Sequence, residues 1–459
     1  MTRNAPQKSA TGRMRGRTVA LGSTITRISG AGALALTLSG CMSPEVADFF
    51  GQSPLVTRTD TMGHFEVAQS ERAEEHHSEI IDLLISRYSI LPRGSSYARV
   101  ADGVIAGAAR TAESELLQAR LRSKSADKNW LPRLGPNVSL TSLSSFVASM
   151  VLDQVLFDNG RRAAERDFAR ADVEAAAVNL SIEQNDRVHQ GLTLYIAAEE
   201  ARAQAKALEG TLREMRELDR IMTARVAGGI SDRSEGNLIT AKVSDLNAAY
   251  QKALRDERTA MAELAAMSPK ALGNLRGVAS LNIRRSGTDT LKLIHARAVE
   301  TRDIAKAAMD RAAMLPGAAA SVKIGDGGGA GVRMTSDQGF GFGTFDAMRA
   351  LDVAKETAAR RTNDEAGDSA RRLAALREKH AAMRARSAEA AALAKRARSD
   401  TTLAEKQFRA GTRTALEIAG VYENLARLDE TAISARYEMA RIEIEIAREM
   451  GLLAEGSKL

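Results

Sequence analysis

The sequence predicts a mainly α-helical protein with a small β part, in which long antiparallel helical hairpins or coiled coils carry two two-stranded β segments. Of the 459 residues, 44% are apolar but only 4% are aromatic, and there are 8 prolines. Such a composition is typical of long helices. Two long helical runs are interrupted by glycine, and two short segments with strand-like alternation each follow a Leu-Pro pair. Together these features predict rods with a small sheet.

The first 40 residues have the parts of a secretory signal peptide. An apolar stretch from Ile28 to Thr37 and a few small residues precede Cys41. Cys41 is the only cysteine, which excludes an internal disulfide. No acid occurs before it, and the basic residues there are Arg3, Lys8, Arg13, Arg15, Arg17 and Arg27. The net charge of +7 falls to about +1 without these six, so little supports a nucleic-acid partner.

The residues Leu38-Ser39-Gly40-Cys41 resemble the bacterial lipobox. The resemblance implies that residues 1–40 are a lipoprotein signal peptide and that Cys41 becomes the lipidated first residue. Met42 in place of aspartate fits delivery to the outer membrane. The alternative is an ordinary signal peptide with an incidental cysteine. We expect residues 41–95 to form an extended or partly helical lead-in from the anchor.

A run of acidic residues and histidines in this lead-in contains the residue types of a metal site. It consists of Glu74, Glu75, His76 and His77. Adjacent residues on a helix point to different faces, and no further histidine or cysteine lies nearby. A solvated helical face is therefore expected in place of a metal site. We expect no cofactor apart from a covalent lipid on Cys41.

A first structural repeat is expected over residues 96–267. It opens with an Ala-rich helix over residues 96–128 and continues with a strand pair at about residues 134–156. The helical pattern resumes at Ala163 and runs to a tip near Gly228, and a second arm returns to Met267. About 65 residues at about 1.5 Å each give a rod near 100 Å long. No ordinary globular domain contains such a rod.

A second repeat follows a linker at residues 268–289 and spans residues 290–454, before a short tail at residues 455–459. Its strand pair is expected at about residues 317–345, with glycines in the loop. A charged helix then runs to a second tip at Gly411. The arm after it has an apolar stripe at steps of three and four, typical of a coiled coil. The stripe consists of Val421, Leu425, Leu428, Ala432, Ala435, Met439, Ile442, Ile446 and Met450.

The order of elements resembles the TolC-like outer-membrane efflux protein family. The motifs that carry this resemblance are Leu156-Phe157-Asp158-Asn159-Gly160-Arg161-Arg162, the tips Ala227-Gly228-Gly229-Ile230-Ser231 and Ala410-Gly411-Thr412-Arg413-Thr414, and the closing Met450-Gly451-Leu452-Leu453. The resemblance implies a homotrimer whose pooled strands form a 12-stranded barrel on an α-helical tunnel. It also implies the exit duct of a tripartite efflux pump or type I secretion system, which passively exports substrate from an inner-membrane transporter and a periplasmic adaptor.

Residue roles follow from the same resemblance. The tips would contact the adaptor through Gly228, Gly229, Ile230, Ser231, Gly411, Thr412, Arg413 and Thr414. Gate candidates are Glu235, Arg413 and Glu417, and Arg413 could pair with Glu235. Glu417 matches one acidic position of the family's gate, whereas Gly420 stands where a second acid would be expected. The tip glycines are equally compatible with a role as helix caps.

The strands support the resemblance independently, because four short strands cannot close a barrel and an open sheet edge is not tolerated in lipid. Several chains would have to pool them, and the resemblance implies that this takes place in the cell outer membrane, with the helices in the periplasm. The second pair contains Lys323, Arg333 and several glycines, so a soluble Gly-rich hairpin is the alternative there. The alternative function is a periplasmic coiled-coil scaffold or adaptor without a pore. A Gly-rich run at residues 325–330 lacks the strand, helix and Gly-Lys-Ser/Thr of a nucleotide site, so no enzyme is predicted.

Overall fold

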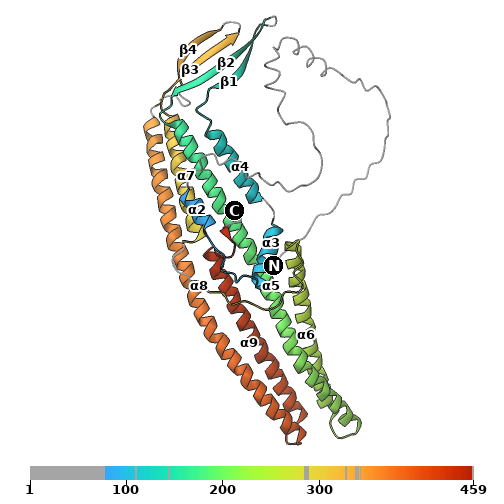
Figure 1. Cartoon of the computed structure of the whole chain (residues 1–459). Coiled ribbons are helices and arrows are strands. Elements are labelled where there is room, and N and C mark those ends of the chain that lie inside the picture. Colours follow the sequence, from blue (N-terminus) through green and yellow to red (C-terminus); the bar gives the residue numbers. More distant parts are fainter. Residues whose placement is uncertain are drawn as a thin grey trace, which may run out of the picture. The chain divides into compact units, whose positions relative to one another are not determined.

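The computed structural model describes residues 78–108, 111–142, 145–283, 289–325, 328–335, 341 and 343–456. The chain divides into two units, Met1–Glu74 and Glu75–Leu459. Within the second unit, two long helical hairpins end at one side in glycine turns and at the other side in a small sheet (Figure 1). The signal peptide, Cys41 and the residues from Glu74 to His77 lie outside the described residues.

Each hairpin pairs a very long helix with a shorter return arm. In the first, α5 (Arg161–Ala227) has 67 residues and α6 (Arg233–Met267) has 35. In the second, α8 (Thr344–Arg409) has 66 residues and α9 (Ala415–Glu449) has 35. Both bounds of α9 lie 182 residues after the corresponding bounds of α6. This constant offset supports the predicted internal duplication.

The helices form one layer. α5 contacts α6 near the tips and α4 (Thr111–Ala126) nearer the sheet, while α8 contacts α9 near the tips and α7 (Leu291–Ala313) nearer the sheet. α7 and α9 both also contact α5, so they fill the space between the two long helices (Figure 1). A single layer of amphipathic helices leaves two broad faces without a covering layer.

Four antiparallel strands form the sheet in the order β1-β2-β3-β4. Their bounds are Arg133–Ser142, Ser145–Phe157, Gly317–Gly325 and Gly329–Thr335. The central pair joins the two repeats, because Asp153 of β2 lies opposite Ser321 of β3. β1 and β4 are both edge strands, so two rows of backbone groups are left open at the sides of the sheet.

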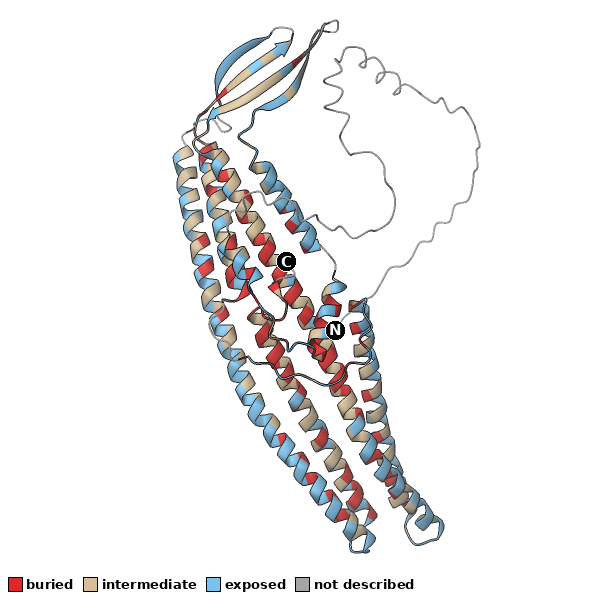
Figure 2. Ribbon diagram, viewed as in Figure 1, coloured by how far each residue is buried: buried red, intermediate tan, exposed pale blue. Residues whose placement is uncertain are grey.

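The buried core lies mainly along α5 and α9, and the middle of the layer holds its largest cluster (Figure 2). There Val100 and Val104 of α3 (Ser96–Ala106) pack on Leu192 and Ile196 of α5, together with apolar residues from the segment after α6. A second cluster near the tips joins the two hairpins, since it contains residues of α5, α6, α8 and α9. α8 buries far less than α5, and its buried residues are only Ala, Thr and Ser.

The ends of the described unit meet beside this core. Arg87, which follows α2 (Glu79–Ile85), is 6% exposed and donates to the carbonyl oxygens of Met450 and Gly451 at the end of α9, and to that of Asp289. Burial lowers the pKa of Arg87 to about 10, so its guanidinium is charged at neutral pH. Asn185 of α5 donates to the Arg448 carbonyl in the same turn. These donors replace the backbone partners that the last turn of α9 lacks.

The structure corrects two expectations about the elements. The helix expected over residues 96–128 is two helices, α3 and α4. α3 ends at Ala106, and only glycine fits at the C-cap position 107, because a Cβ there would lie 2.4 Å from the Met267 carbonyl oxygen. Arg187 donates to the Val104 and Gly107 carbonyl oxygens at this end of the helix. The second strand pair ends at Thr335, so Phe345 belongs to the first turn of α8 and not to a strand.

Among the residues that the structure describes, none of the helices combines the length and the apolar character needed to cross a membrane.

Candidate functional site

The first candidate surface is the tip between α5 and α6. Gly229 has φ +68°, and it donates to the Val226 carbonyl while Ile230 donates to the Arg225 carbonyl. This pair of hydrogen bonds is a Schellman motif, which needs a left-handed residue at the position of Gly229. Gly228 has φ −81°, so the turn does not require glycine there. Ile230 is 78% exposed, an unusual position for a large apolar side chain.

The second tip, between α8 and α9, repeats this motif. Gly411 has φ +75° and donates to the Phe408 carbonyl, and Thr412 donates to the Gln407 carbonyl. Thr414 then starts α9 with a full capping box, in which its hydroxyl accepts from the backbone N–H of Glu417 and the Glu417 carboxylate accepts from the backbone N–H of Thr414. These hydrogen bonds lower the pKa of Glu417.

The predicted gate residues lie at the tips without forming the expected pair. Glu235 is in the first turn of α6, and Arg413 lies in the second tip, but no ion pair joins them in the described part of the chain. The carboxylate of Glu417 is occupied by the capping box. Gly420 is exposed on α9, so the position expected for a second acid offers no charge.

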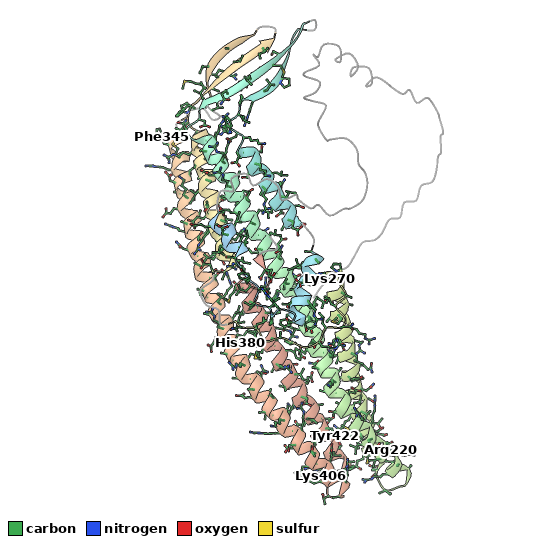
Figure 3. The ribbon with its side chains drawn as sticks, in the orientation of Figure 1. Arg220, Lys270, Phe345, His380, Lys406 and Tyr422 are labelled. Carbon is green, nitrogen blue, oxygen red and sulfur yellow. The ribbon has the colours of Figure 1, made fainter. Side chains whose placement is uncertain are left out.

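Two other contacts join the hairpins close to the tips. Lys242 of α6 forms an ion pair of 2.5 Å with Glu423 of α9. The guanidinium of Arg225, at the end of α5, lies 5.6 Å from the ring centroid of Phe408, at the end of α8. Figure 3 labels Tyr422, the neighbour of Glu423, at this end of the rods. Neither contact was predicted from the sequence, although the opposite charges of Lys242 and Glu423 at nearly equal distances from the two tips were a usable signal for the ion pair.

The second candidate surface is the sheet, whose two faces differ in chemistry. Because paired residues of antiparallel strands share a face, the register places Leu134, Leu152 and Val322 on one side. Apolar residues continue along that side, with one polar exception at Gln154. Its large side chains are exposed at Leu134, Met150, Val322, Ile324, Val332 and Met334. A contiguous exposed apolar face of this kind indicates a surface that is covered in the functional protein.

The opposite face of the sheet carries every charged side chain of the strands that the structure describes. These are Arg133, Asp153, Lys323 and Arg333. Arg333 of β4 forms an ion pair of 3.1 Å with Asp153 of β2, so the interaction connects the two repeats. In the sequence, Lys323 and Arg333 favoured a soluble hairpin over a membrane strand. The register removes that objection, because both lie away from the apolar face.

A cavity lies where this charged face meets the helices. Its lining includes Arg133, Asp153 and Arg333 of the sheet, Arg161 and Arg162 at the start of α5, and residues at the end of α7. Ion pairs connect Arg161 with Glu165 and Arg162 with Asp158. The charged face is thus continuous with the polar start of the long helix.

Comparison with known proteins is informative only at the level of structure. No protein-family model matches the chain, and no curated protein matches its sequence. Among solved structures, the CmeC outer-membrane channel of Campylobacter jejuni matches with a TM-score of 0.65 at 13% identity, over 79% of this chain and 88% of that one. The outer-membrane protein VceC of Vibrio cholerae matches with a TM-score of 0.66 at 14% identity, over 77% and 96%.

The open state of the MtrE outer-membrane channel of Neisseria gonorrhoeae gives a similar result. Its TM-score is 0.62 at 15% identity, over 82% of this chain and 89% of that chain. The predicted mainly helical fold with two strand pairs is confirmed, and none of these three relatives in structure is described as an enzyme. The chain therefore has the fold of the TolC-like outer-membrane efflux channels.

Proposed function

We propose that this protein is the outer-membrane exit duct of a tripartite efflux pump or a type I secretion system. Three copies would pool their sheets into a 12-stranded barrel, and their helical layers would close into a tunnel in the periplasm. Substrate delivered by an inner-membrane transporter would pass through it without chemistry at the duct. We expect no resident metal or cofactor, and no nucleic-acid partner.

One observation carries this proposal: the sheet has an apolar exposed face, a charged face and two open edges. In water such a sheet would aggregate through its edges and its apolar face. In a barrel the edges of neighbouring copies pair, the apolar face contacts lipid and the charged face contacts water. The same closure would bend the helical layer into a tube, which gives its two uncovered faces distinct environments.

Adjacent residues of β3 allow a matched test. Val322 lies on the apolar face and Ser321 on the charged face. An arginine that faces lipid near the middle of the membrane costs about 2–4 kcal/mol, whereas one that faces the lumen costs little. We expect Val322→Arg to deplete the protein from the outer-membrane fraction and to lower the yield of trimer, and Ser321→Arg to leave both unchanged.

The comparison also tests the alternative of a periplasmic scaffold without a pore. A scaffold would place both residues in water, so the two variants would behave alike and the protein would be recovered without membrane. Equal recovery of both variants in the soluble fraction, together with a monomeric mass, would refute the proposed function.

We further propose that the tips bind the adaptor and that Cys41 is lipidated. Exposed Ile230 and the open turns at Gly229 and Gly411 permit a helical hairpin of a partner to approach closely. Ile230→Asp is expected to weaken co-purification of an adaptor, while the exposed, more distant Ile304→Asp is not. Mass spectrometry of the mature N-terminus should show a lipid-modified Cys41 that is absent in Cys41→Ser.

A further inference from the structure

We propose that the charged face of the sheet makes the pore selective for anions, so that small anionic solutes are favoured over cations at this level of the duct. This inference rests on the proposed function, because it needs the face to line a pore. It concerns the sheet, and it is independent of the gate candidates at the tips.

The register sets the sign of the face. Of the strand residues that the structure describes, three basic side chains and one acidic side chain point to it, which gives two net positive charges per chain and six in a trimer. Asp153 is the only acid among the described strand residues, and it is already paired with Arg333. Within the described part of the chain, neither Arg133 nor Lys323 takes part in an ion pair.

The residues directly opposite Lys323 carry no charge. Its cross-strand partners are Val151 on β2 and Gly329 on β4, and Val151 in turn lies opposite Gly135 on β1. Directly opposite residues are the closest ones across a sheet. The nearest acid on the same face, Asp153, is a diagonal neighbour and is paired with Arg333, so the charge of Lys323 is available to a solute in the pore.

The cavity at the base of the sheet does not cancel this charge. Its helical side holds two arginines, Arg161 and Arg162, and each is ion-paired within one helical turn, with Glu165 and Asp158. These four side chains are neutral in sum. Among the residues of this region that the structure describes, the uncompensated charge thus comes from Arg133 and Lys323 of the strands.

A ring of positive charge in a narrow pore attracts anions more strongly than the same charges on an open surface. The low-dielectric wall focuses the field into the water column, and opposing side chains of three copies add their potentials. Rings of arginine or lysine are the usual basis of anion preference in pores. Salt screens the effect beyond about 10 Å at 0.1 M, so it is largest at low ionic strength.

Reversal potentials in planar bilayers test this directly. With the full-length protein in a KCl gradient, we expect the reversal potential to lie closer to the equilibrium potential of chloride than to that of potassium. The permeability to chloride should exceed that to potassium by at least about twofold. The double variant Arg133→Gln, Lys323→Gln should lose most of this preference. The conservative variant Lys323→Arg keeps the charge in place and should retain it, whereas Lys323→Glu should move the preference toward potassium.

The possible outcomes separate the inference from the function on which it rests. A potassium preference of the wild-type channel, or a double variant with unchanged selectivity, would overturn the inference while leaving the channel in place. Absence of any conductance from correctly folded trimers would instead reject the proposed function, and the inference with it. The single variants Lys323→Arg and Lys323→Glu control for loss of folding in the double variant, because they place opposite charges at the same position.

Discussion

The two hairpins have the same lengths and the same turns, but they are packed differently. α5 buries 24 of its 67 residues, including Leu192, Tyr195 and Ile196, because it is in contact with α4 and α7 on the sheet side and with α6 and α9 on the tip side. α8 buries eight of 66, all of them small, and has helices packed along only one side. The two repeats thus have helices of the same length, whereas most of the buried core lies on the long helix of the first repeat.

The tips show the same relation on a smaller scale. Both have a Schellman motif around a left-handed glycine, but only the second has a side-chain cap at the start of the return helix. Thr414 and Glu417 form a capping box, whereas Asp232 makes no capping hydrogen bond. The first tip instead exposes the large side chain of Ile230. Both tips therefore have the same turn geometry, but they differ in rigidity and in surface chemistry.

The largest expected effect contrasts the two long helices. Leu192→Ala removes a fully buried side chain from α5 and should lower the free energy of unfolding by about 2–5 kcal/mol. Leu393→Ala, on α8, removes a side chain that is 49% exposed and should cost less than about 1 kcal/mol. Thermal unfolding followed by circular dichroism would compare them. Equal losses would mean that another copy covers this face of α8.

The next effect contrasts the two tips. Thr414→Ala removes the hydroxyl that accepts from the backbone N–H of Glu417, while the backbone N–H of residue 414 is kept, and should lower the free energy of unfolding by about 0.5–2 kcal/mol. Asp232→Ala has no such bond to remove and should cost only about a few tenths of a kcal/mol through the helix dipole. Hydrogen exchange should become faster at the start of α9 in the first variant. Similar exchange at the two tips of the wild type would contradict the proposed difference in rigidity.

A smaller effect concerns the ion pair between the hairpins. Lys242→Gln or Glu423→Gln breaks a partly exposed contact, so its contribution to stability should be about 1 kcal/mol or less. In the proposed channel the same change loosens the tips, and conductance should rise. The two single variants and the double variant should show equal increases. Additive increases would mean that the two residues act separately.

The smallest effect depends on pH. Asp429 of α9 is 6% exposed, and burial raises its pKa, although the ion pair with Arg398 opposes this. A raised pKa in the folded state favours the protonated carboxyl. The stability that the protonated Asp429 contributes is therefore present at low pH and is lost as the pH rises through the pKa of the folded state. Asp429→Asn should therefore unfold at a slightly higher temperature than the wild type at pH 7, and the gap should close near pH 4. The exposed neighbour Glu430→Gln should show no such gap.

The sequence predicted what depends on local pattern. Helical period and glycine identified both tips, and the structure places left-handed residues at Gly229 and Gly411. Contacts between distant segments were not predictable. The need for glycine at position 107 depends on how closely this residue approaches the Met267 backbone. The favourable placement of Lys323 depends on a pairing of β2 with β3 across more than 160 residues.

The candidate site was predicted to a similar extent. The tip residues were correctly placed at the ends of the rods, because turns have local signals. The link between Lys242 and Glu423 was missed, since it needs the packing of two separate arms. The roles of Glu235, Arg413 and Glu417 in a gate stay predictions, as does the lipid on Cys41.

The constant offset of 182 residues between α6 and α9 limits how such a protein can change its length. One inserted residue turns everything beyond it by about 100° around the helix axis, so side chains that were packed inward would face solvent. Seven residues nearly restore the phase, with a drift of about 20°. A longer or shorter duct would therefore evolve in near-heptad steps, taken in both arms of both hairpins together.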